Sequence, residues 1–376
     1  MKRLFLLACA LMLSFSFFSG TAWALPEINA KSAILIDAAS GRILYEKNAH
    51  ERLPQASTTK ITTALVALEN ADPTKTIRVP DDFVNPGESS IYLEPGEVHS
   101  LEDLLYALLL RSANDAGDAI AIGIAGSLEK FIDMMNEKVA DLGLTDTNYV
   151  NTHGLHQEEH YSSAYDLAMI TKEALKHEEF RKIIVTDKHI IPWPGNEYSR
   201  VADNGNKLLG KYEGADGVKT GYTRQAGSCL VGSATRDGMQ LIAVVLNCNQ
   251  MYDEMARLLD YGFANYKKKD FFQKHQVVEQ IVIDGGKEES VKILAEKPLS
   301  IALSDEEISQ AKVNIYLPEK VKAPVKKGQR MGVAVIDIAG KFTLTTELIA
   351  DHEVEKRSFL SLLWYKITKA IFNKAP

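Results

Sequence analysis

The sequence predicts an α+β fold in which an antiparallel sheet carries helices on both faces, with a helical subdomain beside it and a small all-β domain after it. Segments rich in β-forming residues lie near residues 32–45 and 217–247, and apolar residues recur at helical spacing between them. Beyond residue 269, short β runs alternate with turns. The 376 residues are enough for two domains of ordinary size.

The expected elements follow in order along residues 25–268 and then 269–355. The first part should contain a β-hairpin over 32–45, helices over 57–69, 101–109, 114–126, 127–142 and 163–176, strands over 217–223, 228–234 and 240–247, and a helix over 251–267. The lysine-rich segment 267–270 is interpreted as a linker. Strands of the second part are expected over 277–283, 291–294, 312–316, 331–338 and 342–348.

The composition excludes several classes of protein. Hydrophobic residues make up 45% and charged residues 25%, which is typical of globular proteins and excludes collagen-like, coiled-coil and wholly disordered chains. The formal net charge of −7 argues against a nucleic-acid partner held by a general basic field. Three cysteines are too few for a disulfide scaffold or an all-cysteine zinc site.

The N-terminal segment 1–24 has the features of a secretory signal peptide. A basic start precedes the apolar stretch Leu4–Phe18, and Ala22-Trp23-Ala24 forms a small-x-small cleavage site. A retained membrane helix is the alternative, but the apolar run is shorter than the roughly 18–20 residues that a membrane span prefers. We therefore expect an exported protein. Cys229 and Cys248 then remain, each in an apolar run, and both are expected to be buried.

The C-terminal segment 356–376 differs in charge from the rest of the chain, because it holds five basic residues and no acidic one. Its apolar residues recur at helical spacing: Leu360, Leu363, Trp364, Ile367 and Ile371. The pattern predicts an amphipathic helix that lies in the outer leaflet of the cytoplasmic membrane and anchors the protein peripherally on the extracytoplasmic face. A terminal helix docked on the body is the alternative.

Three short motifs occur in one order: Ser57-Thr58-Thr59-Lys60, Ser112-Ala113-Asn114 and Lys219-Thr220-Gly221. Each motif is weak alone. Indeed Ser127-Leu128-Glu129-Lys130 also matches the first pattern, and we interpret it as an ordinary helix start. The three motifs fall on a helix start, a junction between helices and a strand, behind an export signal. Together they indicate a catalytic site.

The residue types in the first motif suit nucleophilic catalysis. A serine hydroxyl attacks slowly until a neighbouring base removes its proton. Lys60 follows Ser57 by one helical turn, so the two side chains share a face. Burial, together with the positive charge of Lys219, would lower the pKa of Lys60 until its neutral amine acts as the base. The helix start at Ser57 also offers a free N–H group for an oxyanion.

The other two motifs suit a peptide substrate. Ser112 is a candidate to relay a proton between Lys60 and the leaving amine, and Asn114 offers an amide donor and acceptor. Lys219 and Thr220 on a strand suit a free carboxylate, while Gly221 permits close approach of the backbone. The combination predicts a Ser–Lys acyl-transfer site.

These motifs resemble the active-site set of penicillin-binding proteins and serine β-lactamases. The surrounding residues are most similar to those of low-molecular-mass D-alanyl-D-alanine carboxypeptidases, from about Lys31 to the C-terminus. The segments that carry this resemblance are Ala56–Lys60, Asn151–Leu155, His160–Ala164 and Asp216–Thr223. One departure is Thr59, where an apolar residue is commoner.

The resemblance implies removal of the terminal D-alanine from peptidoglycan stem peptides ending in D-Ala-D-Ala, through an acyl-enzyme, and acylation by β-lactam antibiotics. It implies Ser57 as nucleophile, Lys60 as base, Ser112 as proton relay and Lys219 as carboxylate binder. The second oxyanion N–H would belong to Tyr222. No cofactor or metal is implied, and a role in sporulation is suggested by similarity to enzymes of Gram-positive spore formers.

Three rival functions are open. A class A β-lactamase would carry a Glu-x-x-Leu-Asn pattern between Asn114 and Lys219, which is missing. A metallopeptidase could use His153, His156 and His160, but their segment lacks the helical His-Glu-x-x-His arrangement. A non-catalytic sensor of muropeptides or penicillin would be expected to lack part of the motif set, and no part is missing.

Overall fold

The computed structural model describes residues 25–193, 195–358, 360 and 364. The predicted signal peptide lies outside the described residues, as does most of the predicted anchor helix at 356–376. Within the described part of the chain, every helix is too short or too polar to cross a membrane.

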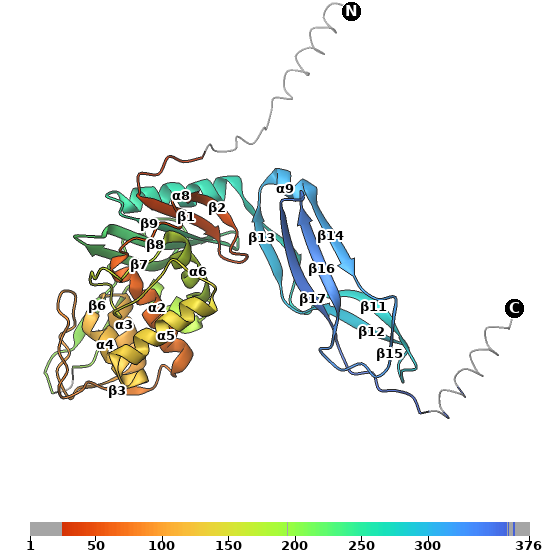
Figure 1. Cartoon of the computed structure of the whole chain (residues 1–376), viewed down its shortest axis with the longest axis horizontal. Helices are drawn as coiled ribbons and strands as arrows, with labels where there is room; N and C mark the ends of the chain where they lie inside the picture. The colour runs from red at the N-terminus through yellow and green to blue at the C-terminus, as the bar shows by residue number, and fades with distance from the viewer. Residues whose placement is uncertain (1–24, 194, 359, 361–363, 365–376) are drawn as a thin grey trace, which may run out of the picture.

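The first domain is built on a five-stranded sheet in the order β2-β1-β9-β8-β7, and each neighbouring pair is antiparallel (Figure 1). The strands are β1 (Ser32–Asp37), β2 (Ile43–Lys47), β7 (Ala215–Thr223), β8 (Gly227–Arg236) and β9 (Met239–Leu246). β9 lies in the middle and is apolar along most of its length, because both of its faces are covered. The predicted hairpin and the three later strands are confirmed.

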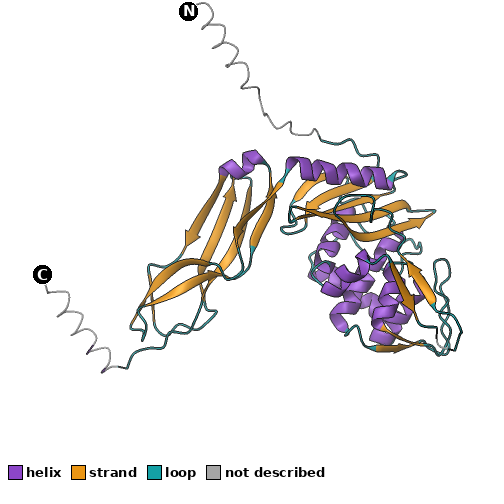
Figure 2. Cartoon of the chain, turned by 180° about the vertical axis from the view of Figure 1, so that it is seen from behind, coloured by secondary structure: helices purple, strands orange, loops and turns teal. Residues whose placement is uncertain are grey.

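Helices cover both faces of this sheet, as predicted (Figure 2). α8 (Met251–Asn265) packs on one face, and α6 (Ala164–Ala174) packs on the other. The second face also carries the helical subdomain, which comprises α2 (Lys60–Asn70), α3 (Leu101–Leu109), α4 (Asn114–Ala125), α5 (Leu128–Asp141) and α7 (Glu178–Val185). Most of the apolar core lies between these helices and the sheet.

Three of these helices have a serine as the N-cap residue. Ser100, Ser127 and Ser163 each accept a hydrogen bond from the backbone N–H three residues later, which satisfies a donor that the helix leaves free. Ser127 accepts from the N–H of Lys130 at 3.3 Å. The second Ser-x-x-Lys match is therefore an ordinary helix start, as predicted.

Two small hairpins and one helix were not predicted from the sequence. β3 (Thr76–Arg78) pairs with β4 (Val98–Ser100), and β5 (Lys188–Ile191) pairs with β6 (Arg200–Asp203). These strands have three or four residues, too few for an alternating pattern to stand out. α7 begins without a side-chain cap. The first hairpin closes a long loop over residues 79–97, which borders the site described below.

The second domain has a six-stranded sheet in the order β14-β16-β17-β12-β11-β15. Its strands are β11 (Val277–Asp284), β12 (Ser290–Ala295), β14 (Ala311–Tyr316), β15 (Lys320–Lys322), β16 (Arg330–Ile338) and β17 (Phe342–Ala350). The five predicted strands are confirmed. Strands β13 (Leu299–Leu303) and β15 and one short helix, α9 (Asp305–Gln310), were missed.

The prediction of a linker at residues 267–270 is wrong. These residues begin strand β10 (Lys267–Phe272), which pairs with β13. Exposed lysines are common on strand edges, where charge discourages pairing with other chains, so the same residues that suggest a linker also suit an edge strand. The strand is held by backbone pairing and by burial of Phe272.

Arg42, in the turn between β1 and β2, joins the two domains. Its guanidinium donates to the backbone oxygen of Ala302 and to the carboxylate of Glu307, both at 3.0 Å. The same group lies 5.6 Å from the centre of the Tyr266 ring. Asp37 adds a second link by accepting a hydrogen bond from the N–H of Ala302 at 3.2 Å.

Candidate active site

Ser57 lies in a short 3-10 helix (Ala56–Thr59) that leads directly into α2. Ala56 has a φ of +49°, an uncommon conformation for a residue with a side chain. Two glycines pack against this turn. A Cβ on Gly154 would lie 1.9 Å from the Ala56 oxygen, and a Cβ on Gly221 would lie 2.9 Å from the Ser57 nitrogen. Glycine at both positions therefore lets two distant segments press on the backbone that carries Ser57.

Lys60 is fully buried, and its Nζ meets three oxygen atoms. The distances are 3.0 Å to Ser57 Oγ, 2.6 Å to Asn114 Oδ1 and 2.9 Å to the backbone oxygen of His153. A neutral amine has two N–H donors and one lone pair. With both donors directed to Asn114 and His153, the lone pair is free to accept the hydroxyl proton of Ser57.

Burial holds the pKa of Lys60 well below its usual range, and the nearby charge of Lys219 lowers it further. The carboxylates of Asp118 and Asp115 act in the opposite direction with a smaller effect. Lys219 on β7 is itself buried, and desolvation lowers its pKa to about 7. Its Nζ donates to the backbone oxygen of Thr220 at 2.9 Å. The site thus contains two buried amines of unusually low basicity.

Asn114 links α4 to the loop that closes one side of the site. Its backbone N–H donates to the oxygen of Ser89 at 2.7 Å, and its Nδ2 donates to the oxygen of Gly87 at 2.8 Å. The next residue, Asp115, accepts hydrogen bonds from the Ser90 hydroxyl at 2.6 Å and the Leu93 N–H at 2.9 Å. The start of α4 therefore holds both the loop and the Lys60 amine.

The three histidines considered as metal ligands have other partners or face solvent. Nδ1 of His160 accepts the N–H of Val150 at 3.1 Å, so the ring proton resides on Nε2, which lies 2.9 Å from Thr59 Oγ1. Burial lowers the pKa of His153 and of His160 to about 3. His156 is exposed. Within the described ranges, His, Cys, Asp and Glu side chains form no group of three or more that could hold a metal ion.

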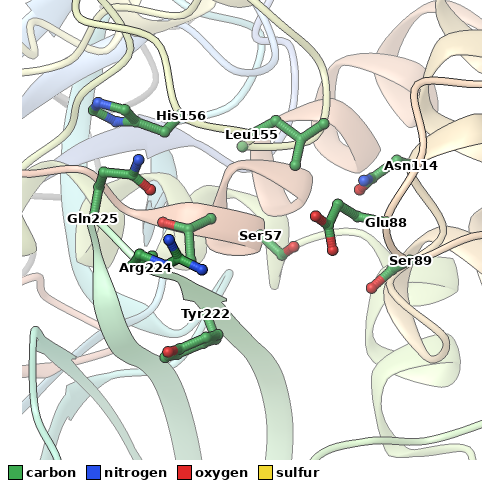
Figure 3. A pocket seen from close by; sticks show the side chains of 11 residues that line it. Ser57, Glu88, Ser89, Asn114, Leu155, His156, Tyr222, Arg224 and Gln225 are labelled. Carbon is green, nitrogen blue, oxygen red and sulfur yellow. The ribbon is translucent and has the colours of Figure 1, made fainter.

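A cavity of about 550 Å³ opens beside Ser57 (Figure 3). Of the predicted site residues, Ser57, Asn114 and Tyr222 line it. Lys60, Ser112, Lys219, Thr220 and Gly221 are not among its lining residues. Lys60 nevertheless contacts Ser57 and Asn114, and Gly221 packs against Ser57. The other residues that line the cavity are Glu88, Ser89, Gly154, Leu155, His156, Thr223, Arg224 and Gln225.

Ser112 is the predicted residue least connected to the others. Its φ of +61° and its partial burial fit the turn between α3 and α4. Its hydroxyl makes no hydrogen bond within the described part of the chain, so its proposed link to Lys60 stays a prediction. Glu88 and Arg224 were not predicted from the sequence. Arg224 follows the third motif closely, whereas Glu88 lies far before the second motif and carries no sequence signal.

Comparison with known proteins agrees with this geometry. The family described as D-alanyl-D-alanine carboxypeptidase matches residues 19–250, and the penicillin-binding protein 5 C-terminal domain matches residues 266–356. D-alanyl-D-alanine carboxypeptidase DacF of Bacillus subtilis is 35% identical, covering 89% of this chain and 88% of the relative. DacC of Escherichia coli is 33% identical, covering 90% and 88%.

A solved structure extends the similarity to both domains. Penicillin binding protein 5 from Haemophilus influenzae superposes with a TM-score of 0.74 at 30% identity, covering 89% of this chain and 100% of that structure. Its α+β architecture with a C-terminal β domain is the one predicted above. The chain belongs to the D-alanyl-D-alanine carboxypeptidase family of serine peptidases.

Proposed function

We propose that the protein removes the terminal D-alanine from peptidoglycan stem peptides through a covalent intermediate on Ser57. The observation that carries this proposal is the contact between the buried Lys60 amine and the Ser57 hydroxyl at 3.0 Å. The low basicity of Lys60 supports its role as general base, because a protonated amine could not accept the hydroxyl proton.

The reaction then has two halves. Lys60 takes the proton from Ser57 as Oγ attacks the carbonyl carbon of the penultimate D-alanine. The C–N bond breaks, and the leaving amine receives a proton through Ser112, releasing free D-alanine. Water then attacks the ester, and the bond between the acyl carbon and Ser57 Oγ breaks. Ser57 regains its proton, and the shortened peptide leaves with a new terminal carboxylate. The N–H groups of Ser57 and Tyr222 would stabilise the negative oxygen that forms in each half.

The third motif would hold the terminal carboxylate of the substrate. Lys219 offers a buried ammonium group, and Thr220 offers a hydroxyl beside it. A substrate carboxylate raises the pKa of a neighbouring amine, so binding would favour the charged form of Lys219. The same site would accept β-lactam antibiotics, which fits the similarity to a penicillin binding protein.

The test is to incubate the mature protein with a peptide ending in D-Ala-D-Ala and to measure free D-alanine. Ser57→Ala should reduce the rate by at least about 10³-fold, since it removes the nucleophile. Intact-mass spectrometry after benzylpenicillin treatment should show one adduct on Ser57. An unmodified Ser57 would exclude the covalent mechanism, and rapid turnover of the adduct would favour a β-lactamase. Acylation without release of D-alanine would favour a sensor.

We also infer export and peripheral attachment to the outer face of the cytoplasmic membrane, with residues 1–24 removed and residues 356–376 as the anchor. The basic, amphipathic pattern of the C-terminal segment supports this inference. A chain truncated after residue 355 should move from the membrane fraction to the soluble fraction while it keeps penicillin binding. A truncated chain that stays with the membrane would contradict the anchor. We also propose a role in sporulation, which predicts that expression rises during spore formation.

A further inference from the structure

Two side chains of opposite charge line the cavity without a partner. Glu88 comes from the loop over residues 79–97, and Arg224 comes from the turn after β7. Figure 3 shows them on opposite sides of Ser57. Neither side chain forms a hydrogen bond or an ion pair within residues 25–193 and 195–358, and both are exposed. They are therefore available to a ligand that reaches Ser57.

The backbone at Glu88 is fixed in an unusual conformation. Its φ is +59°, in the left-handed region that glutamate rarely adopts. Asn114 holds the carbonyl groups on both sides of it, at Gly87 and Ser89, with hydrogen bonds of 2.8 and 2.7 Å. Strained residues that are held in this way tend to gather at ligand sites. Asn114, which also contacts Lys60, thus fixes the backbone on both sides of Glu88.

Arg224 has a similarly defined position on the other wall. It belongs to the tight turn between β7 and β8, where the hydroxyl of Thr223 accepts the N–H of Ala226 at 3.0 Å. Thr223 and Gln225, its neighbours in the turn, also line the cavity. A guanidinium group at this place suits a carboxylate, because its fork of N–H donors matches two carboxylate oxygens.

The opposite signs restrict the kind of ligand. A ligand of one sign would be attracted by one wall and repelled by the other. Lys219 is already assigned to the terminal carboxylate, which leaves Glu88 and Arg224 for the acyl-donor part of the peptide. Side chains of an extended peptide alternate in direction, so neighbouring donor residues would face opposite walls.

We propose that Glu88 and Arg224 determine specificity for a zwitterionic donor peptide, in which one residue carries a free ammonium group and its neighbour a free carboxylate. Glu88 binds the ammonium group, and Arg224 binds the carboxylate. This inference rests on the proposed D-alanine carboxypeptidase activity and adds the charge of the preferred substrate to it.

The test uses four synthetic peptides of equal length ending in D-Ala-D-Ala. The two residues before this end are lysine or ε-acetyl-lysine and glutamate or glutamine, giving zwitterionic, cationic, anionic and neutral donors. Release of D-alanine gives kcat/KM for each. The unaltered protein should favour the zwitterionic donor over the neutral one by at least about tenfold. The preference should shrink with added salt, because the pairs are exposed.

The variants separate the two charges. Glu88→Gln should reduce the preference for lysine over acetyl-lysine to below about twofold and leave the preference for glutamate. Arg224→Gln should do the reverse. Glu94→Gln removes an exposed carboxylate from the same loop outside the cavity, and Arg330→Gln removes an exposed guanidinium from the second domain. Both controls should keep all four rates, and thermal unfolding should confirm that every variant is folded.

The outcomes distinguish failure of the charge specificity from failure of the proposed carboxypeptidase activity. Equal rates for all four peptides would overturn the specificity assignment and leave the carboxypeptidase activity standing. A uniform loss over all four peptides in Glu88→Gln or Arg224→Gln would assign these residues a structural role instead. Absence of D-alanine release from every peptide, with Ser57 unmodified by benzylpenicillin, would overturn the proposed function and this inference together.

Discussion

The two domains both bury a continuous apolar core, but they differ in the polar groups that they bury. The first domain encloses lysine, aspartate, asparagine and histidine side chains, including Lys60, Lys219 and Asp115. Among the described residues after 266, Thr346 is the one buried polar side chain. Several ion pairs of that domain, such as Lys287 with Glu355, are exposed.

This difference identifies the residues at which the needs of the site lower the stability of the fold. Burying an amine without a counter-charge is unfavourable, and a depressed pKa is the direct sign of that cost. The first domain accepts the cost at Lys60 and Lys219, next to Ser57. The second domain has no such group among its described residues.

The largest expected effect comes from removing the buried base. Lys60→Met should lower the rate of penicillin acylation by at least about 10³-fold, because Ser57 then lacks a proton acceptor. Intact-mass spectrometry over time measures the rate. The matched control Lys312→Met removes an exposed lysine from the second domain and should leave the rate unchanged. A Lys60→Met rate within tenfold of the original would mean that another group acts as base.

The next effect concerns the pH dependence of stability. Lys219 has a pKa of about 7 in the folded protein and about 10.5 when unfolded. Between these values the unfolded chain binds more protons, so the free energy of unfolding rises with pH. From pH 7 to 9, Lys219 should raise the free energy of unfolding by on the order of 2 kcal/mol. The Lys219→Met variant should lack this rise.

Denaturant unfolding at several pH values between 7 and 9 measures this slope. The window stays below the range where tyrosines titrate. Lys60 contributes in the same direction in both proteins. Loss of the Lys219 charge raises the pKa of Lys60 and so can only reduce that contribution, which means that the slope of Lys219→Met should still fall. Lys312→Met, which alters an exposed lysine, should keep the original slope. If Lys219→Met also keeps the original slope of unfolding free energy against pH, Lys219 is charged in the folded protein.

A matched pair of threonines compares the two interiors directly. Thr59 donates to the Ala56 oxygen at 2.9 Å and accepts from the buried His160 ring. It also accepts a hydrogen bond from the Gln55 Nε2 at 3.1 Å. Thr59→Val removes the partner of all three groups and should lower the free energy of unfolding by about 2 kcal/mol. Thr346→Val loses two longer hydrogen bonds with the Lys297 backbone, one donated to its oxygen at 3.2 Å and one accepted from its N–H at 3.4 Å. It should lower the free energy of unfolding by less than about 1 kcal/mol. Urea unfolding measures both, and equal losses would contradict the contrast between the domains.

The smallest effect should come from the junction. Arg42→Ala removes the contacts with Ala302 and Glu307 and should lower stability by about 1 kcal/mol. Calorimetry should show the two domains unfolding more separately, with penicillin acylation unchanged. Arg330→Ala removes a more exposed pair with Glu347 and should change stability by less than about 0.5 kcal/mol. A single unaltered transition in Arg42→Ala would show that other contacts couple the domains.

Local patterns predicted much of this fold. Serine caps, apolar periodicity and the Asp237-Gly238 turn act within a few residues, and the elements they indicate are present. The lysines at 267–269 led to the wrong prediction of a linker, because an edge strand and a linker can share the same composition. Strand β13 was also missed, and its partner is the strand that those lysines begin, β10.

The site was predictable only in part for a related reason. Ser57 and Lys60 lie three residues apart, so their contact follows from helix geometry. Their meeting with Asn114 depends on long-range packing, which the ordered motifs suggested and the resemblance made specific. Glu88 and Arg224 have no local signature, because which loop residues face a cavity is decided by contacts far along the chain.

The two glycines that press on the turn at Ala56 bear on how the protein matures. Residues 56, 154 and 221 are far apart in sequence, so the reactive serine reaches its final position only after the domain's long-range topology is complete. A chain that is still partly unfolded would be chemically inert toward drug and substrate alike. Labelling by penicillin during refolding would then report the last stage of assembly rather than the formation of α2.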